Sequence, residues 1–369
     1  MGNLKRLVIT CGGTGGHFYP GLSIARDFKE HGEVKLLLSG EHAPEQKKIA
    51  DKFAVDTIAL PKMPRLGKAP IQFAIGFIKG FFAAYKELKN CSPQALLGMG
   101  SFATLPVILA AFFRRIPIFL HDGNARIGKA NRWFSYIAKA AGCAYPAVNA
   151  SKCRCPLTVC GMPLRPELRE KSGISRNEAI AEINKLFETD FDVNVPLILI
   201  TGGSLGAEVF NTVLPEALKM VSGKFQIVHL SGKTKLEKTV EHYAGLTVKK
   251  LLLETTSAMD LFLAAADLVF SRSGGSTTAE LALFGKNSIL VPYPYAAEGH
   301  QMDNARYFES HQAAVVVKNS DLTVEKASEL IRDFLNNDPA LTTLCENMKT
   351  LARPEASKQM LEEISNYID

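Results

Sequence analysis

The chain has 369 residues, of which 47% are hydrophobic and 22% are charged. This length favours two domains, and this composition excludes a small disulfide-stapled fold, a collagen-like chain and extended disorder. The formal net charge is +6. Spread over so long a chain, that excess fits an anionic substrate or an acidic membrane surface better than a protein that wraps nucleic acid.

The cysteines predict a reducing compartment. There are seven, an odd number, and most stand alone among apolar residues, so we expect no disulfide framework. Cys153, Cys155 and Cys160 form a C-x-C-x4-C run without a nearby histidine, which is not the usual spacing of a zinc or iron–sulfur site. We interpret them as ordinary thiols.

The N-terminal residues show no secretory signal, because the strand-like run Leu7–Thr10 follows without an apolar segment and cleavage site before it. The longest apolar stretch, Ile71–Tyr85, is interrupted by Lys79 and is shorter than the roughly 20 residues that a spanning helix needs. These features predict a soluble, intracellular protein.

Apolar strands, glycine-rich turns and amphipathic helices alternate along the whole chain. In the first half we expect strand 7–10, helix 22–30, strand 34–39, strand 95–97, helix 106–113 and strand 116–120. In the second half we expect strand 197–201, a helix to 218, strands 225–230, 248–253 and 268–270, a helix to 284, strand 288–291 and a last helix at about 354–367. This alternation is typical of βαβ units and predicts an α/β fold with parallel sheets.

The two halves also share a weak internal repeat. Residues 9–13 resemble residues 200–203, about 190 positions later, which indicates two copies of one architecture. A glycine and two prolines between 161 and 166 are typical of a connecting segment. We therefore predict domains at 1–162 and 163–350, with residues 351–369 forming a helix that packs back on the body.

Four glycine-rich turns join a strand to a helix, at about 12–16, 98–100, 202–206 and 273–275. Glycine lets the backbone approach a ligand closely, and a helix N-terminus offers N–H groups and the positive end of the helix dipole. Together the turns predict phosphate or diphosphate binding at the carboxyl ends of the strands. The alternative is that these glycines serve only the packing of helices on the sheet.

Two common nucleotide motifs do not fit these turns. None is followed by Lys-Ser or Lys-Thr, so there is no Walker A loop. The first turn reads Gly-Gly-Thr-Gly-Gly-His rather than G-x-G-x-x-G, and Glu41 is imperfectly placed to hold a ribose. A nicotinamide-dependent dehydrogenase is therefore disfavoured.

His17 follows the first turn at the start of a helix. The positive end of the helix dipole favours the neutral imidazole there, and a neutral imidazole can act as a general base. The alternative is a histidine that caps the turn or contacts a phosphate, and the residues alone leave both open.

The segment Arg272–Glu280 places a cation, hydroxyl groups and backbone N–H groups at one helix start, which suits an anionic group. The Glu280 carboxylate can accept two hydrogen bonds from a ribose diol, or it can simply stabilise the helix dipole. His300 and Gln301 follow the strand that ends near Pro292, and they are candidates for binding sugar hydroxyls.

Asp190 and Asp192 match the D-x-D pattern that holds a divalent metal in some sugar transferases. They lie in a polar connector before a strand and away from any glycine turn. We therefore do not predict a metal site there.

The segment Ile71–Leu88 is rich in aromatic residues and is flanked by basic ones. This pattern suits a surface that contacts anionic lipid, and it equally suits a core helix with a lysine-bearing outer face. The aromatic residues are Phe73, Phe77, Phe81, Phe82 and Tyr85, and the basic residues in or near the segment are Lys62, Arg65, Lys68, Lys79, Lys86 and Lys89.

Taken together, these motifs resemble the MurG family of bacterial peptidoglycan glycosyltransferases, from Leu7 to about Leu335. The match is specific as an ensemble. Its parts are residues 12–17 with Pro20 and Gly21, 97–100, 121–124, 161–165, 202–207 with Asn211, 272–274, Glu280, Gln301, and 304–305.

The resemblance implies two Rossmann-like domains in the GT-B arrangement, inversion at the anomeric carbon, and no active-site metal or other cofactor. It implies transfer of N-acetylglucosamine from UDP-GlcNAc to lipid I, giving lipid II for peptidoglycan synthesis. The C-terminal domain would bind UDP-GlcNAc, and the N-terminal domain would bind the acceptor. The implied location is the cytoplasmic face of the inner membrane, contacted through Ile71–Tyr85, with cell-wall synthesis or division proteins as candidate partners and no nucleic acid.

Site residues carry over by position. The candidate donor-binding residues are Arg165, Gly203, Ser204, Thr256, Arg272, Ser273, Gly274, Gly275, Ser276, Thr277, Thr278, Ala279, Glu280, His300 and Gln301. Among them Glu280 would hold the ribose, His300 and Gln301 the sugar, and the backbone of Thr256 the uracil. The candidate residues for the acceptor and its diphosphate are Thr14, Gly15, Gly16, Gly100 and Asn124, with His17 as the candidate catalytic base.

Three positions depart from the family pattern. Asp122-Gly123 stands where the family usually has Glu-Gln, Met162 where it has Asn, and Leu205 where it has Gln. The departures leave two alternatives open. One is a nucleotide-sugar 2-epimerase on the same scaffold, and the other is a catalytically silent scaffold protein that binds a sugar nucleotide.

Overall fold

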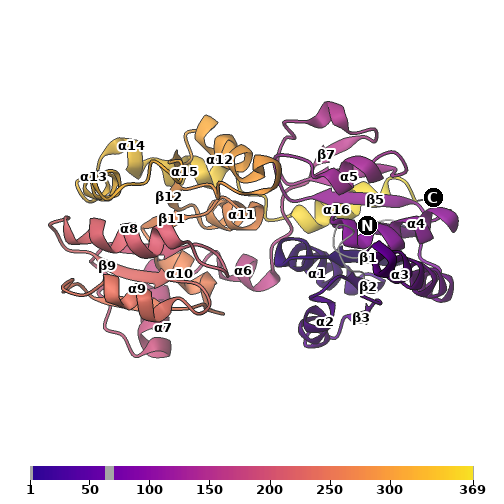
Figure 1. Ribbon diagram of the computed structural model, residues 1–369. Coiled ribbons are helices and arrows are strands. Elements are labelled where there is room, and N and C mark those ends of the chain that lie inside the picture. Colours follow the sequence, from indigo (N-terminus) through magenta and orange to yellow (C-terminus); the bar gives the residue numbers. More distant parts are fainter. Residues whose placement is uncertain (1–2, 63–69, 369) are drawn as a thin grey trace. The chain divides into compact units, whose positions relative to one another are not determined.

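The computed structural model describes residues 3–62 and 70–368 (Figure 1). The contacts divide the chain into two compact units. The first unit comprises Met1–Pro166 and Arg353–Asp369, and the second unit comprises Glu167–Ala352. Each unit contains one parallel β-sheet with helices packed against it, which confirms the predicted α/β class with two parallel sheets.

The sheet of the first unit has seven strands in the order β3-β2-β1-β4-β5-β6-β7. The chain adds strands on one side of β1 and then on the other, so the order reverses between β1 and β4. In an open α/β sheet such a reversal leaves a ligand-binding crevice at the carboxyl ends of the two strands. The strands are β1 (Arg6–Gly12), β2 (Glu33–Ser39), β3 (Asp56–Ala59), β4 (Ala95–Gly98), β5 (Ile118–Asp122), β6 (Ala140–Cys143) and β7 (Leu157–Val159).

Both faces of this sheet are buried, because side chains of a strand point alternately to opposite faces. Leu7 and Ile9 of β1 join the core under α1 (Gly15–Lys29), α2 (Ala43–Asp51) and α16 (Ala356–Ser365). Val8 joins the core under α3 (Pro70–Cys91), α4 (Leu105–Phe113) and α5 (Lys129–Phe134). The last helix of the chain therefore belongs to the first unit. Two short 3-10 turns are η1 (Phe102–Thr104) and η2 (Ala150–Lys152).

The second unit repeats this design with six parallel strands in the order β10-β9-β8-β11-β12-β13, which reverses between β8 and β11. The internal repeat in the sequence thus corresponds to two copies of one topology. The strands are β8 (Leu197–Thr201), β9 (Gln226–Leu230), β10 (Lys250–Leu253), β11 (Leu268–Ser271), β12 (Asn287–Leu290) and β13 (Val315–Val316). The helices are α6 (Pro166–Lys171), α7 (Arg176–Phe187), α8 (Glu208–Lys219), α9 (Leu236–His242), α10 (Met259–Ala265), α11 (Gly275–Phe284), α12 (His300–Ser310), α13 (Val324–Leu335), α14 (Pro339–Thr342) and α15 (Leu344–Thr350), with a 3-10 turn η3 (Ala297–Gly299).

Two predicted boundaries were wrong. The first helix begins at Gly15 rather than near residue 22, although Pro20 lies inside it. The second boundary concerns the strand expected at 116–120, which is β5 and runs on to Asp122. His121 and Asp122 are therefore held in the sheet rather than in the loop that follows it.

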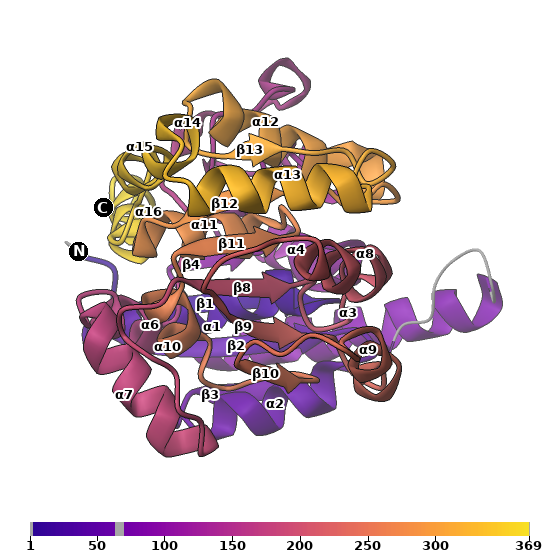
Figure 2. The ribbon, with the colours of Figure 1, turned by 90° about the vertical axis from the view of Figure 1, so that its left-hand side faces the viewer.

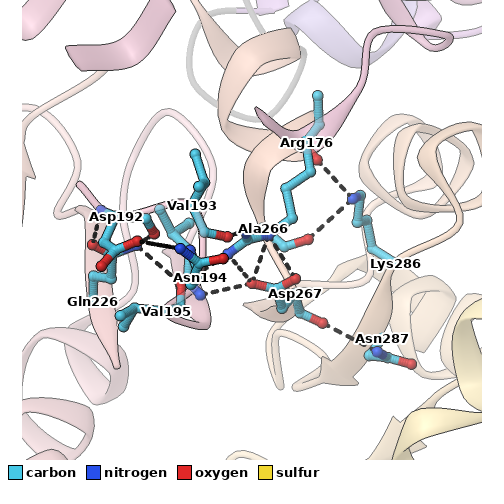
Figure 3. Close-up of polar contacts among 12 residues, drawn as sticks. Arg176, Asp192, Val193, Asn194, Val195, Gln226, Ala266, Asp267, Lys286 and Asn287 are labelled. Carbon is cyan, nitrogen blue, oxygen red and sulfur yellow. Dashed lines mark hydrogen bonds and ion pairs between the residues drawn. The ribbon is translucent and has the colours of Figure 1, made fainter. Parts of the chain in front are cut away.

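A polar network closes the second unit at the amino ends of its strands, opposite the glycine turns (Figure 3). The Arg176 guanidinium pairs with both carboxylate oxygens of Asp267, at 2.7 to 3.1 Å, and Asp267 also accepts a hydrogen bond from the backbone N–H of Leu197. The Lys286 ammonium donates to the carbonyls of Ala264 and Ala266, each at 3.0 Å. This end of the sheet is thus sealed by polar side chains that fasten α7 and β12 to β8 and β11.

The D-x-D pair lies at the same end. Asp190 forms an ion pair of 2.7 Å with Lys249, and a hydrogen bond from that lysine lowers the pKa of Asp190. Asp192 accepts a hydrogen bond from the backbone of Asn194, and its own backbone is held by Gln226 (Figure 3). Both carboxylates therefore fix the loop before β8, at the edge away from the glycine turns.

Lys286 gives the second unit a distinctive response to alkaline pH. Burial lowers the pKa of Lys286 to about 8, partly opposed by the Asp267 carboxylate, whereas an unfolded lysine titrates near 10.5. Between these values the unfolded chain holds more protons, so the free energy of unfolding rises with pH, by up to about 3 kcal/mol for this group. Urea unfolding of the wild type and Lys286→Met at pH 7.5 and 10 should show a stability difference that moves in favour of the wild type at pH 10. An unchanged difference would contradict this assignment.

Candidate functional site

The first unit presents its glycine turn at the carboxyl end of β1. Thr14 precedes α1 in an extended conformation, and its side chain does not cap the helix. Thr14, Gly15 and Gly16 are exposed. The N-terminus of α1 therefore faces solvent with backbone donors and the positive end of the dipole, which is the arrangement that binds phosphate groups.

His17 is fixed within this turn by one backbone contact. Its Nδ1 lies 2.8 Å from the carbonyl oxygen of Met99, at the end of β4. A carbonyl can only accept a hydrogen bond, so Nδ1 must carry a proton and donate it. In the neutral ring the lone pair is then on Nε2. The contact thus selects the tautomer that a general base needs.

Gly100 completes this side of the crevice. Its φ is +88°, and a Cβ there would lie 3.3 Å from the His17 ring and 3.4 Å from Nδ2 of Asn131. The space beside the imidazole is therefore kept by the absence of a side chain, and the backbone conformation itself favours glycine. The turns after β1 and β4 meet at His17, as the reversal of strand order requires.

Asp122 organises the neighbouring turn after β5. One carboxylate oxygen accepts from the backbone N–H of Asn124, at 3.2 Å. The other accepts from the N–H of Gly128 and from Nδ2 of Asn131, at 2.8 and 3.0 Å. Asn124, half-exposed, is therefore held at the end of β5 by the first of the three residues that depart from the family pattern.

His121 lies behind this turn and is 1% exposed. Its Nε2 donates to the carbonyl of Gly161 at 2.9 Å, which ties β5 to the segment after β7. Burial lowers the pKa of His121, and this contact opposes the shift only in part. His121 is therefore a neutral structural link rather than a proton-transfer group.

Two of the departures from the family pattern touch each other. A Cβ at Gly123 would lie 2.5 Å from Cε of Met162, and the Met162 side chain is almost fully buried. Met162 thus fills the volume next to Gly123 where the family's larger residue would begin. The absent side chain at 123 and the long apolar side chain at 162 form one compensated pair.

The remaining candidate of the first unit is Arg165, which lies near its end. The guanidinium lies 5.7 Å from the ring centre of Tyr19 on α1, within the range of a cation–π contact. This contact brings its positive charge toward the helix whose N-terminus carries the glycine turn.

In the second unit the glycine turn after β8 is built on two positive φ angles. Gly203 has φ +78° and a Cβ there would meet nothing within 4 Å, whereas Gly206 has φ +66° and a Cβ there would lie 1.8 Å from the carbonyl oxygen of Ser231. Gly203, Ser204 and Leu205 are exposed, and Leu205, the third departure, is 77% exposed. The exposed half of the turn is thus held by the close approach of its other half to the end of β9.

A buried network fastens that end of β9. Nε2 of His229 donates to the amide oxygen of Asn211 at 3.0 Å, and Asn211 donates to the Ser231 carbonyl at 3.0 Å. Nδ1 of His229 accepts from the Tyr243 hydroxyl at 2.8 Å. Burial lowers the pKa of His229 to about 3, so the ring is neutral and one tautomer satisfies every contact. The network fixes the carbonyl against which Gly206 packs.

The start of α11 forms the second part of the donor side. No side chain of Gly274 is available to cap the helix, and its first turn contains no acidic residue. Thr278 uses its hydroxyl on the carbonyls of Gly274 and Gly275, at 3.1 and 3.2 Å. Of the predicted hydroxyl groups in this helix, those of Ser276 and Thr277 are half-buried, while that of Thr278 is already committed. Ala279 and Glu280 follow on the same turn and are also half-buried.

Arg272 supports this helix start from below. Its guanidinium donates to the carbonyl of Val291 at 2.9 Å and to Asn319 at 2.8 Å. It also lies 5.1 Å from the ring centre of Phe210 and 5.6 Å from that of Tyr293. Burial lowers its pKa, but an arginine side chain remains charged. The residue therefore supplies a fixed positive charge at the carboxyl ends of β11 and β12.

The loop after β12 is joined to this helix start. The Ser273 hydroxyl donates to the backbone carbonyl of Gln301 at 2.8 Å, and Asn304 donates to the carbonyl of Ser273 at 2.9 Å. The Gln301 side chain accepts from the backbone of Tyr293 at 2.9 Å, which leaves its amide nitrogen as the donor group. His300 contacts the carbonyl of Ala297 at 2.8 Å through Nδ1. Both predicted sugar-binding side chains thus lie at the start of α12.

Thr256 belongs to the loop between β10 and α10. Its hydroxyl accepts from the backbone N–H of Ala258 at 2.9 Å, which shapes the turn. All the predicted donor residues of the second unit follow the carboxyl ends of β8, β10, β11 and β12. Since parallel strands end at one edge, the second unit gathers them on that edge, with the turns after β8 and β11 at the reversal point.

Several residues of these networks were not singled out from the sequence. His229 is a polar residue within an apolar strand, and that pattern was the available signal for a buried, hydrogen-bonded group. Asn131 and Asn319 gave no signal, because they come close to the site only through the fold.

The cysteines are free thiols. Burial raises the pKa of Cys155 to about 11 and that of Cys160 to about 12, so both are protonated at neutral pH. Among residues 3–62 and 70–368, no group of three histidine, cysteine, aspartate or glutamate residues is placed to hold a metal ion.

Helix α3 combines both readings of the aromatic segment. Ala84 and Leu88 are buried in the core of the first unit, whereas Ile71, Ile78 and Phe82 are 74%, 52% and 64% exposed. Phe73, Phe77, Phe81 and Tyr85 stack along the helix with ring centres 6.0 to 6.5 Å apart. Lys79, Lys86 and Lys89 are exposed, and Arg65 and Lys68 lie outside the described residues.

The first part of α3 extends beyond its neighbour. A Cβ at Gly80 would lie 3.5 Å from Pro106, the second residue of α4, so residues 70–79 continue past the start of α4. Ten helical residues span about 15 Å. In Figure 2 these turns stand away from the rest of the first unit. None of the helices within the described ranges is long and apolar enough to cross a membrane.

Comparison with known proteins agrees with this geometry. Residues 7–143 match the glycosyltransferase family 28 N-terminal domain, and residues 197–360 match the family 28 C-terminal domain. A relative from Desulforamulus reducens, named UDP-N-acetylglucosamine--N-acetylmuramyl-(pentapeptide) pyrophosphoryl-undecaprenol N-acetylglucosamine transferase, is 32% identical over 374 residues, covering 97% of each chain.

Solved structures extend the comparison. MurG from Acinetobacter baumannii superposes with a TM-score of 0.77 at 27% identity, over 98% of this chain and 99% of that one. A UDP-GlcNAc 2-epimerase from Neisseria meningitidis has a TM-score of 0.68 at 14% identity, over 98% of this chain and all of that one, which shows a shared fold alone. The resemblance found in the sequence is confirmed: the chain belongs to glycosyltransferase family 28 and is a glycosyltransferase of the MurG type.

Proposed function

We propose that the protein transfers N-acetylglucosamine from UDP-GlcNAc to lipid I, with inversion at the anomeric carbon and without a metal ion. The observation that carries this proposal is similarity over nearly the whole chain to relatives named for that reaction. The second unit is the donor-binding domain, and the first unit is the acceptor-binding domain.

The donor half needs to stabilise a diphosphate that gains negative charge as the glycosidic bond to UDP breaks. The N-termini of α8 and α11 offer backbone donors, and Arg272 supplies a fixed positive charge close to α11. Preorganised donors of this kind can contribute several kcal/mol each to the transition state. Glu280 takes the ribose diol, while His300 and Gln301 take the sugar.

The acceptor half activates the attacking hydroxyl. His17 removes the proton of that hydroxyl through Nε2 as its oxygen attacks the anomeric carbon, because Nδ1 is committed to the Met99 carbonyl. The turn 14–16 and Gly100 receive the diphosphate of the lipid acceptor, and Asn124 lies at the next strand end. The proton, the new glycosidic bond and the leaving UDP are then all accounted for without a further group.

The acceptor carries a lipid chain, so this unit must work at a membrane surface. The projecting turns of α3 present Ile71, Ile75 and Ile78 together with exposed Lys79. Apolar side chains beside lysines favour binding in the headgroup region of an anionic bilayer. We therefore place the protein on the cytoplasmic face of the inner membrane, attached through α3.

The test is transfer of labelled sugar from UDP-GlcNAc to a soluble lipid I analogue in the presence of EDTA. We expect labelled product and one UDP for each sugar transferred, with a β-linkage detectable by NMR. Interconversion of the UDP-sugar without acceptor would indicate an epimerase. UDP binding without any turnover would indicate a silent scaffold.

Glu280→Ala should lower kcat/KM for the donor at least tenfold, because the ribose diol loses a carboxylate that accepts two hydrogen bonds, an effect of about 1.5–3 kcal/mol. Steady-state kinetics with varied UDP-GlcNAc measure this. Glu298→Ala is the matched control, since Glu298 is exposed and lies in the same unit. Unchanged donor kinetics for Glu280→Ala would remove the ribose assignment.

A further inference from the structure

Charge is distributed very unevenly along the first unit. Residues 57–166 contain fifteen lysine and arginine residues but only two carboxylates, Glu87 and Asp122, although the net charge of the whole chain is only +6. Residues 123–166 contain no carboxylate side chain at all. This part of the chain therefore carries a strong local positive charge that the net charge conceals.

Three aromatic side chains are exposed within this region, away from α3. Phe102 is 47% exposed, Trp133 72% and Tyr136 68%. The rings of Phe102 and Trp133 lie 6.5 Å apart, and the Arg154 guanidinium lies 5.8 Å from the ring centre of Tyr136. We call Phe102, Trp133, Tyr136 and Arg154 the aromatic–basic face.

The face is held in a fixed shape. Trp133 and Tyr136 are one helical turn apart at the end of α5, and the backbone N–H of Arg154 donates to the hydroxyl of Ser135 at 3.0 Å. Phe134, between them, is buried in the core shared by α3, α4 and α5. The exposed rings are thus presented outward by a packed helix end, not by a loose loop.

Exposed lysines surround this face. Lys129, Lys139 and Lys152 are exposed, and no acidic residue lies between positions 123 and 166. Tryptophan and tyrosine are enriched where protein meets the headgroup region of a bilayer, because their rings are apolar at one end and polar at the other. Basic residues near such rings add attraction to anionic headgroups. The chemistry of the face therefore matches an anionic lipid interface.

The position of the face matches as well. Phe102 follows Gly100 by two residues, and Trp133 follows Asn131, whose amide contacts Asp122 and lies close to Gly100. The face thus borders the glycine turn proposed for the acceptor diphosphate. A lipid-linked diphosphate lies at headgroup depth, so side chains beside its binding turn meet the headgroups too.

We propose that the aromatic–basic face is a second contact with the anionic bilayer, separate from α3, which seats the acceptor turns at headgroup depth. This inference rests on the proposed lipid-linked acceptor. Attachment through α3 alone tethers the unit, whereas a second contact beside Gly100 also fixes which edge of the sheet faces the lipid.

The protein carries its own probe for this contact, because Trp133 is the only tryptophan of the chain. We would add vesicles of phosphatidylglycerol and phosphatidylethanolamine to the full-length protein and record tryptophan emission. Expected are a shift to shorter wavelength and quenching by lipids brominated near the headgroup, with neither effect on phosphatidylcholine vesicles. If the protein sediments with the anionic vesicles while Trp133 emission stays unchanged and unquenched, the face does not touch lipid and the proposal fails.

Kinetics give an independent test. Trp133→Ser combined with Tyr136→Ser should leave transfer to a soluble acceptor analogue unchanged, and should lower transfer to lipid I embedded in anionic vesicles about tenfold or more. The matched control is Phe82→Ser on α3, which should weaken vesicle sedimentation while the remaining bound protein keeps its Trp133 shift. Equal activity of the double variant on both acceptors would overturn the proposal. Failure of the wild type to use the soluble acceptor would instead count against the proposed function, since the fluorescence test needs no turnover.

Discussion

His17→Ala is expected to lower kcat by about 10²- to 10⁴-fold, the usual contribution of a positioned general base, while donor KM changes little. The physical reason is the Met99 carbonyl, which holds Nδ1 protonated and leaves the Nε2 lone pair for the acceptor hydroxyl. Steady-state kinetics with each substrate varied in turn separate the two parameters. The pH profile of kcat should also lose its lower limb in the variant, because that limb reports protonation of the base.

A phosphate-binding histidine would behave differently. Its loss would raise the acceptor KM and leave the shape of the kcat profile intact. His42→Ala is the matched control, since the His42 side chain is 59% exposed on the same unit and lies outside the proposed site. A normal kcat for His17→Ala would end its assignment as the base.

Gly206→Ala should destabilise the second unit by at least about 3 kcal/mol and abolish donor binding. A Cβ at Gly206 would lie 1.8 Å from the Ser231 carbonyl oxygen, which is backbone and is itself held by Asn211. Neither partner can move away without breaking the network around His229. The positive φ of +66° adds a further strain of about 1–2 kcal/mol.

Gly203→Ala is a closely matched comparison. Gly203 has nearly the same φ in the same turn, but nothing lies within 4 Å of its Cβ position. Its substitution should therefore cost only about 1–2 kcal/mol for the backbone conformation. Urea unfolding of both variants measures the difference. Equal destabilisation would mean that the turn relaxes away from Ser231, contrary to the fixed backbone inferred here.

The repeated topology was predictable because it rests on local signals. Buried parallel strands are continuous apolar runs, and each functional turn is marked by glycine at a strand end. These signals placed the turns around Gly13, Gly100, Gly203 and Gly274 at strand ends, and the reversal of strand order then brings them together in pairs within each unit.

Other features follow from tertiary packing, which no local pattern records. Pro20 and Gly21 indicate a turn by propensity, yet they lie within α1, where a Cβ at Gly21 would meet Cys11 Sγ at 2.3 Å. Close packing of the helix on β1 overrides the local preference. His229 acquires its role only because Asn211 and Tyr243 come together in the folded unit. The division of α3 between core and exposed surface likewise depends on where α4 begins.

The return of the chain to the first unit has a consequence for biosynthesis. Met360, Leu361 and Ile364 of α16 are fully buried in the same core as Leu7 and Ile9. All contacts of the second unit, by contrast, lie within one continuous segment, Glu167–Ala352. As the ribosome releases the chain, the nucleotide-sugar-binding unit is therefore complete first. The unit that starts at the N-terminus must wait, with part of its apolar surface uncovered, until the last helix has been made.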